Sequence, residues 1–419
     1  MVSIPLPARS IVGRPRRGPG PLLLVSGTLV ALLCLIPPLY LVVRAAGSWD
    51  TALDTMLSGS ALETTVNTVA LAALVTAFAI AIALPMAWLV ERSDLRGRRA
   101  IGILAALPLA IPSYVGAMAF IAAFGPRGML QGWLEPLGVE RLPSIYGFPG
   151  AVLVLTLFTY PYLFLTLRPA LAAADPRVEE LSRTFGYSGW VTFRRVVLPS
   201  LRPALTSGSL LVALYVLSDF GAPTLLRFSS FTRVIFARYT TAFDRSTAAA
   251  LALLLVALAL AVVALEVWAR SKRRLDAIRD AGRPAAPVAL GKWQWPAYGF
   301  IGAVLTLALV LPLGVLFYWL GRGLEDGVAF QGAGSLIIDS VTASGLAAAA
   351  AVVVGLPVAL LAVRYRGWFS RSVEVASYTG YALPGLVVAL ALVFAAVQFS
   401  WLYQTLPLLV VAYVLLFLP

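Results

Sequence analysis

Long uninterrupted apolar segments dominate this chain of 419 residues and limit the folds open to it. Several of these segments reach the roughly 20 residues that a helix needs to cross about 30 Å of hydrocarbon. Charged residues make up only 12% of the chain, whereas a soluble domain is about a quarter charged. A membrane β-barrel would alternate over about 10 residues instead of forming solid Leu, Ala and Val blocks. The sequence therefore predicts an all-α polytopic membrane protein.

The apolar segments predict about ten membrane spans. We expect them at residues 22–43, 62–90, 101–124, 150–170, 203–225, 246–268, 297–320, 340–363, 374–396 and 404–419. The basic N-terminal tail resembles the start of a signal peptide, but the apolar run behind it is too long for one. It is interpreted as an uncleaved first span.

Positive charges cluster in alternate loops of the chain, whose formal net charge is +13. Basic groups lie in the N-terminal tail and at 92–99, 171–202, 269–296 and 364–371, whereas the loops at 44–61 and 321–339 are acidic. Because basic loops stay in the cytoplasm, we expect the N-terminus to be cytoplasmic. This account of the charge leaves no reason to expect a nucleic-acid partner.

One loop that should be external is nevertheless basic. It spans residues 226–245 and contains Arg227, Arg233, Arg238 and Arg245. Either a single exception is tolerated, or these arginines form a patch for an acidic external partner through charge complementarity. The sequence favours neither alternative.

The chain contains an internal repeat. A shift of 272 residues places 67–120 on 339–392 without a gap. The shift superimposes Leu84-Pro85 on Leu356-Pro357, Arg92 on Arg364, Arg99 on Arg371 and Pro112 on Pro384. Because the shift covers an even number of spans, it predicts two parallel halves rather than inverted ones.

The repeat also predicts how the chain is divided. We expect a first half at 1–268 with six spans, a cytoplasmic linker at 269–296 and a second half at 297–419. The second half stops where the first half continues into a polar loop and two more spans. We therefore expect about 10 spans of an expected 12 and interpret the second half as truncated.

The residues that most enzymes need for chemistry are scarce. The chain has no His and a single Cys, Cys34, which lies in the first apolar run and has no partner for a disulfide or a metal site. It also has no Gly-rich phosphate-binding loop ending in Lys and Ser or Thr. We expect no catalytic residues, no metal site and no cofactor on this chain, so any ATP must bind to another protein.

A polar stretch at about 171–203 stands out between two spans. Asp175 is placed to cap a short helix at 177–187, and Glu179 and Glu180 fall in its first turn, where the helix dipole favours acids. Gly186 is suited to end this helix in a left-handed conformation. The pattern alone leaves open whether the stretch binds another protein or is an ordinary cytoplasmic loop.

The spacing of this stretch resembles a family motif. Glu180-Leu181-Ser182-x3-Gly186-x9-Val196-x-Leu198-Pro199 is similar to the Glu-Ala-Ala-x3-Gly-x9-Ile-x-Leu-Pro loop of ABC-importer permeases. Leu181, Ser182 and Val196 depart from the family residues, while all spacings are kept. The resemblance implies a permease of the type I fold in the bacterial inner membrane. It also implies that this loop contacts a cytoplasmic ATPase, present in two copies, which holds ATP and Mg.

Two further segments narrow the resemblance. Residues 107–117 and 217–222 are similar to segments of the fused, two-half permeases of ferric-iron importers. This implies transport of ferric iron delivered by an extracytoplasmic binding protein, for which the arginines of 226–245 are the candidate docking site. Related permeases for thiamine and polyamines share the architecture and remain alternatives.

Asp219 is the most unusual residue within an apolar segment. A charge near the middle of the bilayer costs at least about 2.5–3.5 kcal/mol, so this carboxylate should face protein or water. It either lines the translocation path or ends a helix at the external interface before Gly221 and Pro223. The second alternative is favoured.

Two other classes of protein compete with the importer interpretation. A major-facilitator transporter also has two parallel six-span halves, and Asp94-Leu95-Arg96-Gly97-Arg98-Arg99 is similar to its loop motif. That class gives no reason for the motif at 180–199. A membrane-embedded enzyme would need clustered His, Asp or Glu within the spans, and the sequence shows no such cluster.

Overall fold

The computed structural model describes residues 18–47, 49–174, 176–240, 245–271, 287–327, 332–365, 367–399 and 401–418. Within these ranges every regular element is helical, apart from one isolated parallel bridge between Ser93 and Val288. The predicted all-α membrane architecture is confirmed.

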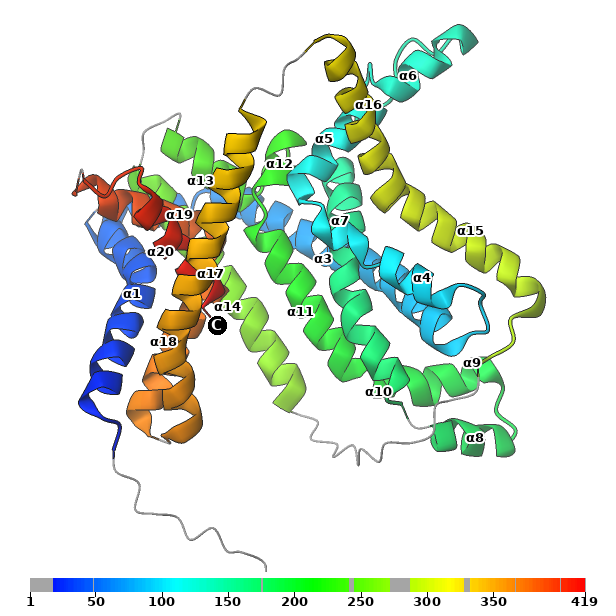
Figure 1. Cartoon of the computed structure of the whole chain (residues 1–419), viewed down its shortest axis with the longest axis horizontal. Helices are drawn as coiled ribbons and strands as arrows, with labels where there is room; N and C mark the ends of the chain where they lie inside the picture. The colour runs from blue at the N-terminus through cyan, green and yellow to red at the C-terminus, as the bar shows by residue number, and fades with distance from the viewer. Residues whose placement is uncertain are drawn as a thin grey trace, which may run out of the picture. The chain divides into compact units, whose positions relative to one another are not determined.

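The helices follow one another with short connections (Figure 1). In chain order they are α1 (Pro21–Ala46), α2 (Trp49–Met56), α3 (Gly59–Arg92), α4 (Arg98–Leu104), η1 (Leu107–Ala110), α5 (Ser113–Phe124), α6 (Met129–Leu134), η2 (Glu135–Leu137), α7 (Phe148–Ala172), α8 (Pro176–Thr184), α9 (Gly189–Thr192), η3 (Phe193–Val197), α10 (Leu198–Ser200), α11 (Arg202–Ser218), α12 (Gly221–Leu225), α13 (Phe231–Thr240), α14 (Arg245–Ser271), η4 (Gly291–Trp293), α15 (Gln294–Leu305), η5 (Thr306–Val310), α16 (Leu311–Glu325), α17 (Ala333–Arg364), α18 (Trp368–Ala382), α19 (Gly385–Val397) and α20 (Leu406–Phe417).

Fewer helices than predicted have the length of a full span. Among the described residues, six helical segments are long and apolar enough to cross a membrane, or up to eight if two bent pairs are each counted as one span. The last two apolar helices, α19 and α20, have only 13 and 12 residues. The count of ten spans stays a prediction.

Three predicted spans are not continuous helices. The span predicted at 101–124 is split into α4, η1 and α5, and its two arms meet at 95°. The span predicted at 374–396 is split between α18 and α19 before Gly385, and the one at 203–225 ends with α11 at Ser218. Pro108, Pro112 and Pro384 lie at the first two breaks, because proline lacks the N–H that a helix needs and clashes with the preceding turn.

The helix boundaries recur at the offset of the sequence repeat. α3 ends at Arg92 and α17 at Arg364, and α5 begins at Ser113 and α19 at Gly385, so both pairs are 272 residues apart. In each copy the residue before the second boundary is a proline, Pro112 or Pro384. The repeated sequence positions thus terminate and restart helices in the same way in both copies.

The chain folds into two compact units, which are described separately. Unit 1 contains Met1–Tyr40, Gly332–Leu383 and Val387–Pro419, and unit 2 contains Leu41–Gln331 and Pro384–Leu386. The boundaries of these units do not fall at the predicted linker 269–296. The halves 1–268 and 297–419 therefore stay a prediction from the sequence repeat.

Unit 1 is built from most of α1 and α19 together with all of α17, α18 and α20. α17 packs on α18 and α20. Gly27 of α1 leaves room for Leu361, because an added Cβ would lie 2.6 Å from the Leu361 Cδ1 atom. Further along α1, the ring of Tyr40 stacks on Phe394 with the centroids 5.4 Å apart.

Unit 2 is centred on α3, α7 and α11, which pack against one another. Ala79, Ala83 and Ala87 form a buried stripe along α3 at a spacing of four residues. In lipid, helices associate through close packing, and small side chains allow their backbones to approach. Gly116 serves the same purpose in α5, because a Cβ there would collide with the ring of Phe158 in α7.

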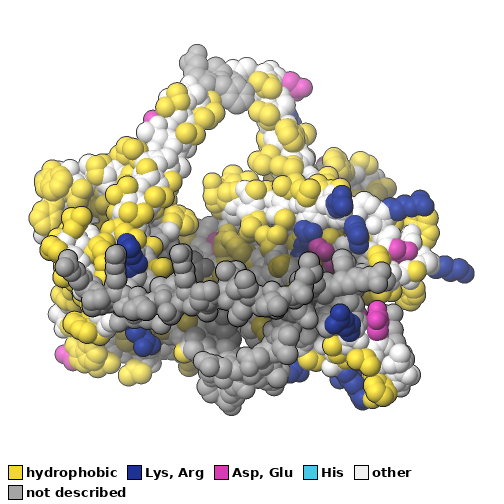
Figure 2. Space-filling view, turned by 60° about the horizontal axis from the view of Figure 1, so that its bottom comes forward, with side chains coloured by type: hydrophobic (Ala, Val, Ile, Leu, Met, Phe, Trp, Pro, Cys, Tyr) yellow, Lys and Arg dark blue, Asp and Glu magenta, His cyan; other side chains and the backbone are white. Residues whose placement is uncertain are grey.

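The two ends of unit 2 differ in what they present. α4 and α8 to α10 lie at one end, whereas α6, α12 and α13 lie at the other (Figure 1). Several Lys and Arg side chains lie over the end formed by α4 and α8 to α10, while hydrophobic side chains cover much of the spans (Figure 2). The first end is the one predicted to be cytoplasmic.

Candidate functional site

The predicted motif helix forms as α8, Pro176–Thr184. Gly186 follows it with φ of +79°, the left-handed conformation predicted for this position. The Tyr187 N–H donates to the Ser182 carbonyl over 3.2 Å, which closes the helix end in the manner of a Schellman cap. The predicted cap Asp175 lies outside the described residues. The glycine is required here because a Cβ strains the left-handed backbone.

The two faces of α8 have opposite character. Ser182 is buried, and its hydroxyl lies 3.0 Å from that of Thr192. Glu180 and Leu181 are exposed. The exposed apolar side chains continue beyond the helix; we name Val178, Leu181, Phe185, Tyr187 and Trp190 the outer face of the loop. Phe185 and Trp190 are 77% and 70% exposed, so large apolar groups are left without cover within this chain.

The second arm of the loop, from α9 to α10, contains a widened helical turn. The N–H of Leu198 bonds to the carbonyl of Phe193, five residues back, which makes η3 a π-turn. Pro199 explains this geometry, because a proline ring clashes with the carbonyl four residues before it in a regular helix. The same widening occurs at η5, which precedes Leu311-Pro312. Val196, Leu198 and Pro199 are half-buried, and Val197 is buried.

Arg92, the last residue of α3, joins α8 to the spans. It is only 6% exposed, and its Nη2 atom lies 3.0 Å from Oε1 of Glu179, which is 17% exposed. Its Nε atom donates to the carbonyl of Leu171 over 3.1 Å, at the end of α7, where carbonyls lack helical partners. A single guanidinium therefore ties α3 to both α7 and the motif helix.

A second ion pair lies beside the first. Nε of Arg168 in α7 is 2.6 Å from Oε1 of Glu91 in α3. The Arg168 guanidinium also lies 5.5 Å from the ring centroid of Phe164. The last turn of α3 is thus held to α7 at two consecutive residues.

The chain segment that precedes η4 is also attached to the end of α3. The Val288 N–H donates to the Arg92 carbonyl over 2.8 Å, and the Asp94 N–H donates to the Val288 carbonyl over 3.2 Å. Oδ1 of Asp94 accepts the Leu290 N–H over 3.0 Å. Asp94, which resembled part of a major-facilitator loop, therefore has a structural role here.

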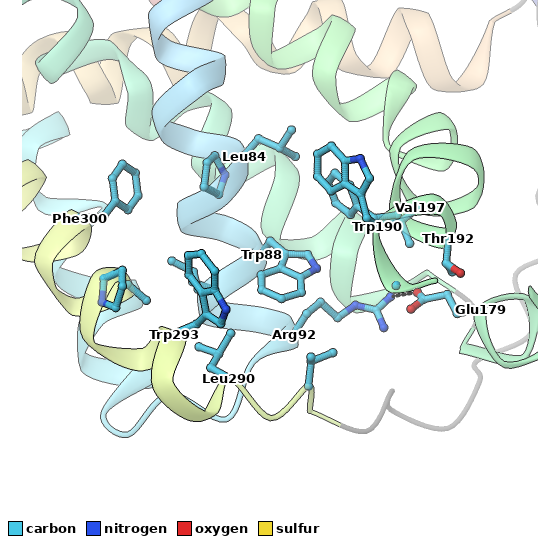
Figure 3. A pocket seen from close by; sticks show the side chains of 17 residues that line it. Leu84, Trp88, Arg92, Glu179, Trp190, Thr192, Val197, Leu290, Trp293 and Phe300 are labelled. Carbon is cyan, nitrogen blue, oxygen red and sulfur yellow. Dashed lines mark ion pairs between the residues drawn. The ribbon is translucent and has the colours of Figure 1, made fainter. Parts of the chain in front are cut away.

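These contacts enclose a groove of about 740 Å³ (Figure 3). Trp88, Trp190 and Trp293 lie around it, and Arg92 points toward Glu179 at its edge. Most of its remaining lining is apolar, including Leu84, Pro85, Phe193, Val288, Leu290 and Phe300. The groove separates the motif loop from the start of α15.

Sequence reasoning missed Arg92 and Glu179 as contact residues. It treated Arg92 as one of several loop charges and Glu179 as a helix-end acid. Arg92 lies two residues after an apolar run that ends at Val90, and a solvated arginine at a helix end would have the same sequence neighbours.

At the opposite end of unit 2, Asp219 follows α11. Its Oδ1 atom accepts the Ala222 N–H over 3.1 Å and so caps α12, and its carbonyl accepts the Thr232 hydroxyl over 2.7 Å. The residue is buried. Asp219 therefore lies between the end of α11 and the start of α12, and its place at the external interface stays a prediction.

The structure describes the side chains of three of the four arginines predicted as a docking patch in the loop at 226–245. Arg227 follows α12 and lies over the ring of Tyr146, 5.0 Å from its centroid. Arg233 and Arg238 are five positions apart on α13, so at about 100° per residue they point in directions about 140° apart. Arg245 begins α14, and its side chain is outside the described part of the structure.

No group of three or more His, Cys, Asp or Glu side chains that could hold a metal ion occurs among the described residues. Unit 2 is a bundle of apolar helices with a polar, aromatic-rich loop at one end and an arginine-containing loop region at the other. These features are those of a multi-pass transport permease.

Comparisons with known proteins agree with this class. Residues 79–275 match the family described as binding-protein-dependent transport system inner membrane component. The chain is 32% identical to the Fe(3+)-transport system permease protein FbpB 2 of Haemophilus influenzae over 412 residues. The matched region is 97% of this chain and 78% of that protein.

Two further relatives match a smaller part of this chain. The putative ferric transport system permease protein FbpB 1 of Haemophilus influenzae is 25% identical over 346 residues, which are 76% of this chain and 53% of that protein. The molybdenum transport system permease protein ModB of Mycobacterium tuberculosis is 34% identical over 225 residues, which are 52% of this chain and 82% of that protein.

The chain belongs to the family of binding-protein-dependent transport system inner membrane components. It is a multi-pass inner-membrane permease of an importer of this type, and the resemblance found in the motif at 180–199 is confirmed. Family membership decides against the major-facilitator and membrane-enzyme alternatives.

Proposed function

We propose that this chain forms the translocation path of an ATP-driven importer of ferric iron. In this proposal the loop of α8 to α10 binds a cytoplasmic ATPase, which holds ATP and Mg, and an extracytoplasmic binding protein delivers the substrate. The chain itself makes and breaks no covalent bonds.

The observation that carries the ATPase contact is the outer face of the loop. Val178, Leu181 and Phe185 follow the three- and four-residue spacing of one helix face and are exposed. Aromatic and aliphatic side chains at this density are typical of the centre of a protein interface. The motif residues Glu180, Leu181 and Gly186 lie on or beside this face, while Ser182 supports it from within.

The inner contacts of the loop give it a rigid connection to the spans. Arg92 binds α8 through Glu179 and α7 through Leu171, and Ser182 contacts Thr192 in the second arm. A displacement of α8 by the ATPase would therefore be passed to the ends of α3 and α7. Rigid-body motion of packed helices is a common way to convert such a displacement into a change of access.

The test is co-purification of the chain with the ATPase of the same transport system. We expect Phe185→Glu and Leu181→Glu to reduce ATPase binding by at least tenfold, because each places a charge in an apolar contact. Trp133→Glu is the matched control, since Trp133 is 74% exposed at the other end of unit 2. Equal binding by all three variants would rule out the outer face as the ATPase contact.

The choice of ferric iron rests on relatives. The permease of Haemophilus influenzae that matches almost the whole chain is a ferric transport protein by name. We expect cells that express the complete system to take up radioactive ferric iron, and uptake to stop when the outer face is disrupted by Phe185→Glu. Uptake that is unchanged when the permease gene is deleted would exclude iron as the substrate.

Molybdate is the second candidate substrate, because a molybdenum permease is 34% identical over about half of this chain. The same cells distinguish the two substrates. Uptake of radioactive molybdate in place of iron would favour the second candidate.

A further inference from the structure

A second cavity lies at the end of unit 2 that is opposite the motif loop. It has a volume of about 750 Å³ and is lined by residues of α5, of the loop that follows it and of α16. Arg127 and Arg141 contribute the charges, and Tyr146, Tyr318 and Trp319 contribute aromatic rings. Among the described residues, no carboxylate lines this cavity.

The fold of the loop brings the two arginines together. The Leu142 N–H donates to the Pro126 carbonyl over 3.2 Å, which places the adjacent residues Arg141 and Arg127 at one site. The side-chain amide of Gln131 donates to the Val139 carbonyl over 3.2 Å and so fixes the part of the loop that leads back to Arg141. Two like charges placed together repel each other, so this arrangement favours an anionic partner.

Two further arginines lie against the aromatic lining. Arg227 is 5.0 Å from the ring centroid of Tyr146, and Nη1 of Arg322 donates to the Tyr318 hydroxyl over 3.2 Å. Arg227 has φ of +56° because it ends α12 in a left-handed turn, in which the Phe228 N–H donates to the Pro223 carbonyl over 2.8 Å.

We propose that this cavity receives carboxylate side chains of the extracytoplasmic binding protein and orients that protein on the permease. The inference rests on the proposed function and makes Arg127 and Arg141, rather than the arginines of α13, the principal docking residues. Arg, Tyr and Trp are the residues that contribute most binding energy at protein interfaces. The family depends on a binding protein, and the two arginines that line the cavity can pair with carboxylates of that protein and so fix its orientation.

The surface around the cavity fits a protein better than a small ion. Trp133 and Leu137, at the tip of the same loop, are 74% and 78% exposed. Arg127 and Arg141 are exposed as well, so both guanidinium groups can be reached from solvent. A small anion would use the arginines but not the apolar tip.

The experiment measures association of the permease in lipid nanodiscs with the binding protein of the same system. We expect Arg127→Glu combined with Arg141→Glu to lower the association rate about tenfold or more and to weaken its salt dependence. Arg99→Glu, an exposed arginine of α4 at the other end of unit 2, should change the rate less than twofold. Because both cavity arginines are exposed, these substitutions should not prevent folding.

Two comparisons distinguish the possible outcomes. If Arg233→Glu combined with Arg238→Glu slows association and the cavity variant does not, α13 is the docking surface and the inference is wrong. If the cavity variant abolishes binding of ferric citrate or molybdate alone but not of the binding protein, the cavity takes a small anion and the inference is also wrong. ATPase co-purification, measured on the same variants, reports separately on the proposed function, because it depends on the opposite end of the unit.

Discussion

Breaking the ion pair between Arg92 and Glu179 by removing one partner should destabilise the protein strongly. Replacing Arg92 by Met keeps the length of the apolar stem but removes three contacts: the Glu179 carboxylate at 3.0 Å and the carbonyls of Leu171 at 3.1 Å and Ala174 at 3.4 Å. The side chains of Arg92 and Glu179 are 6% and 17% exposed, so solvent screens the pair weakly. Removing one partner of such a pair costs about 3–5 kcal/mol, because the other charge is left buried.

A double-mutant cycle separates the pair from the carbonyl contacts. Glu179→Gln removes the charge and keeps an oxygen, so we expect a smaller loss of about 1–3 kcal/mol. In the double variant the cost should fall short of the sum of the single variants by about 1–3 kcal/mol, since the residues are in direct contact. The measurement is the free energy of unfolding from reversible denaturant titration in mixed micelles.

Arg96→Met is the control for the cycle, because Arg96 is an exposed arginine of the same loop. Exposed substitutions usually change stability by less than about 0.5 kcal/mol. The reasoning would be refuted if Arg92→Met cost no more than Arg96→Met, or if the losses of the two single variants simply added in the double variant.

Three further substitutions test other parts of the fold. Gly186→Val should lower the unfolding free energy by about 1–2 kcal/mol, because a side chain is strained at φ of +79°. Gly186→Asn should lower the unfolding free energy less. Equal losses in the two variants would argue against a conformational cause. Gly116→Leu should cost about 1–3 kcal/mol or more in the same titration by colliding with Phe158, whereas Gly299→Leu, with open space around it, should be tolerated. Asp219→Ala should cost about 1 kcal/mol through loss of the α12 cap, and Asp219→Asn, which keeps the acceptor, should cost little; a similar loss in both would show that the charge, not the cap, is needed.

Several local features could be predicted because neighbouring residues determine them. The length of an apolar run and its lack of charge are enough to predict a membrane helix. Gly186 could be assigned a left-handed conformation from its place after a short polar helix, and Pro112 and Pro384 recur at the repeat offset, where helices begin anew. Pro108 and Pro112 are also enough to explain why the predicted span at 101–124 is broken.

The candidate site depends on contacts that are distant in sequence. Arg92 and Leu171 are 79 residues apart, and only the packing of α3 along α7 brings them together. From the sequence, Arg92 was one of many loop arginines, and nothing in its neighbours distinguished a buried ion pair from a solvated charge. The cavity at the opposite end depends in the same way on one backbone hydrogen bond, between Leu142 and Pro126.

The sequence by itself determined the class of this protein, the approximate positions of its apolar segments and the motif that identifies its loop. These follow from hydrophobicity, helix-breaking residues and fixed spacing, which act over a few turns of chain. The tertiary structure alone decided which charges are paired, which face of the loop is left open and which arginines share a cavity. Those outcomes depend on contacts between side chains that form only after the helices have packed. Composition and spacing do not predict such contacts.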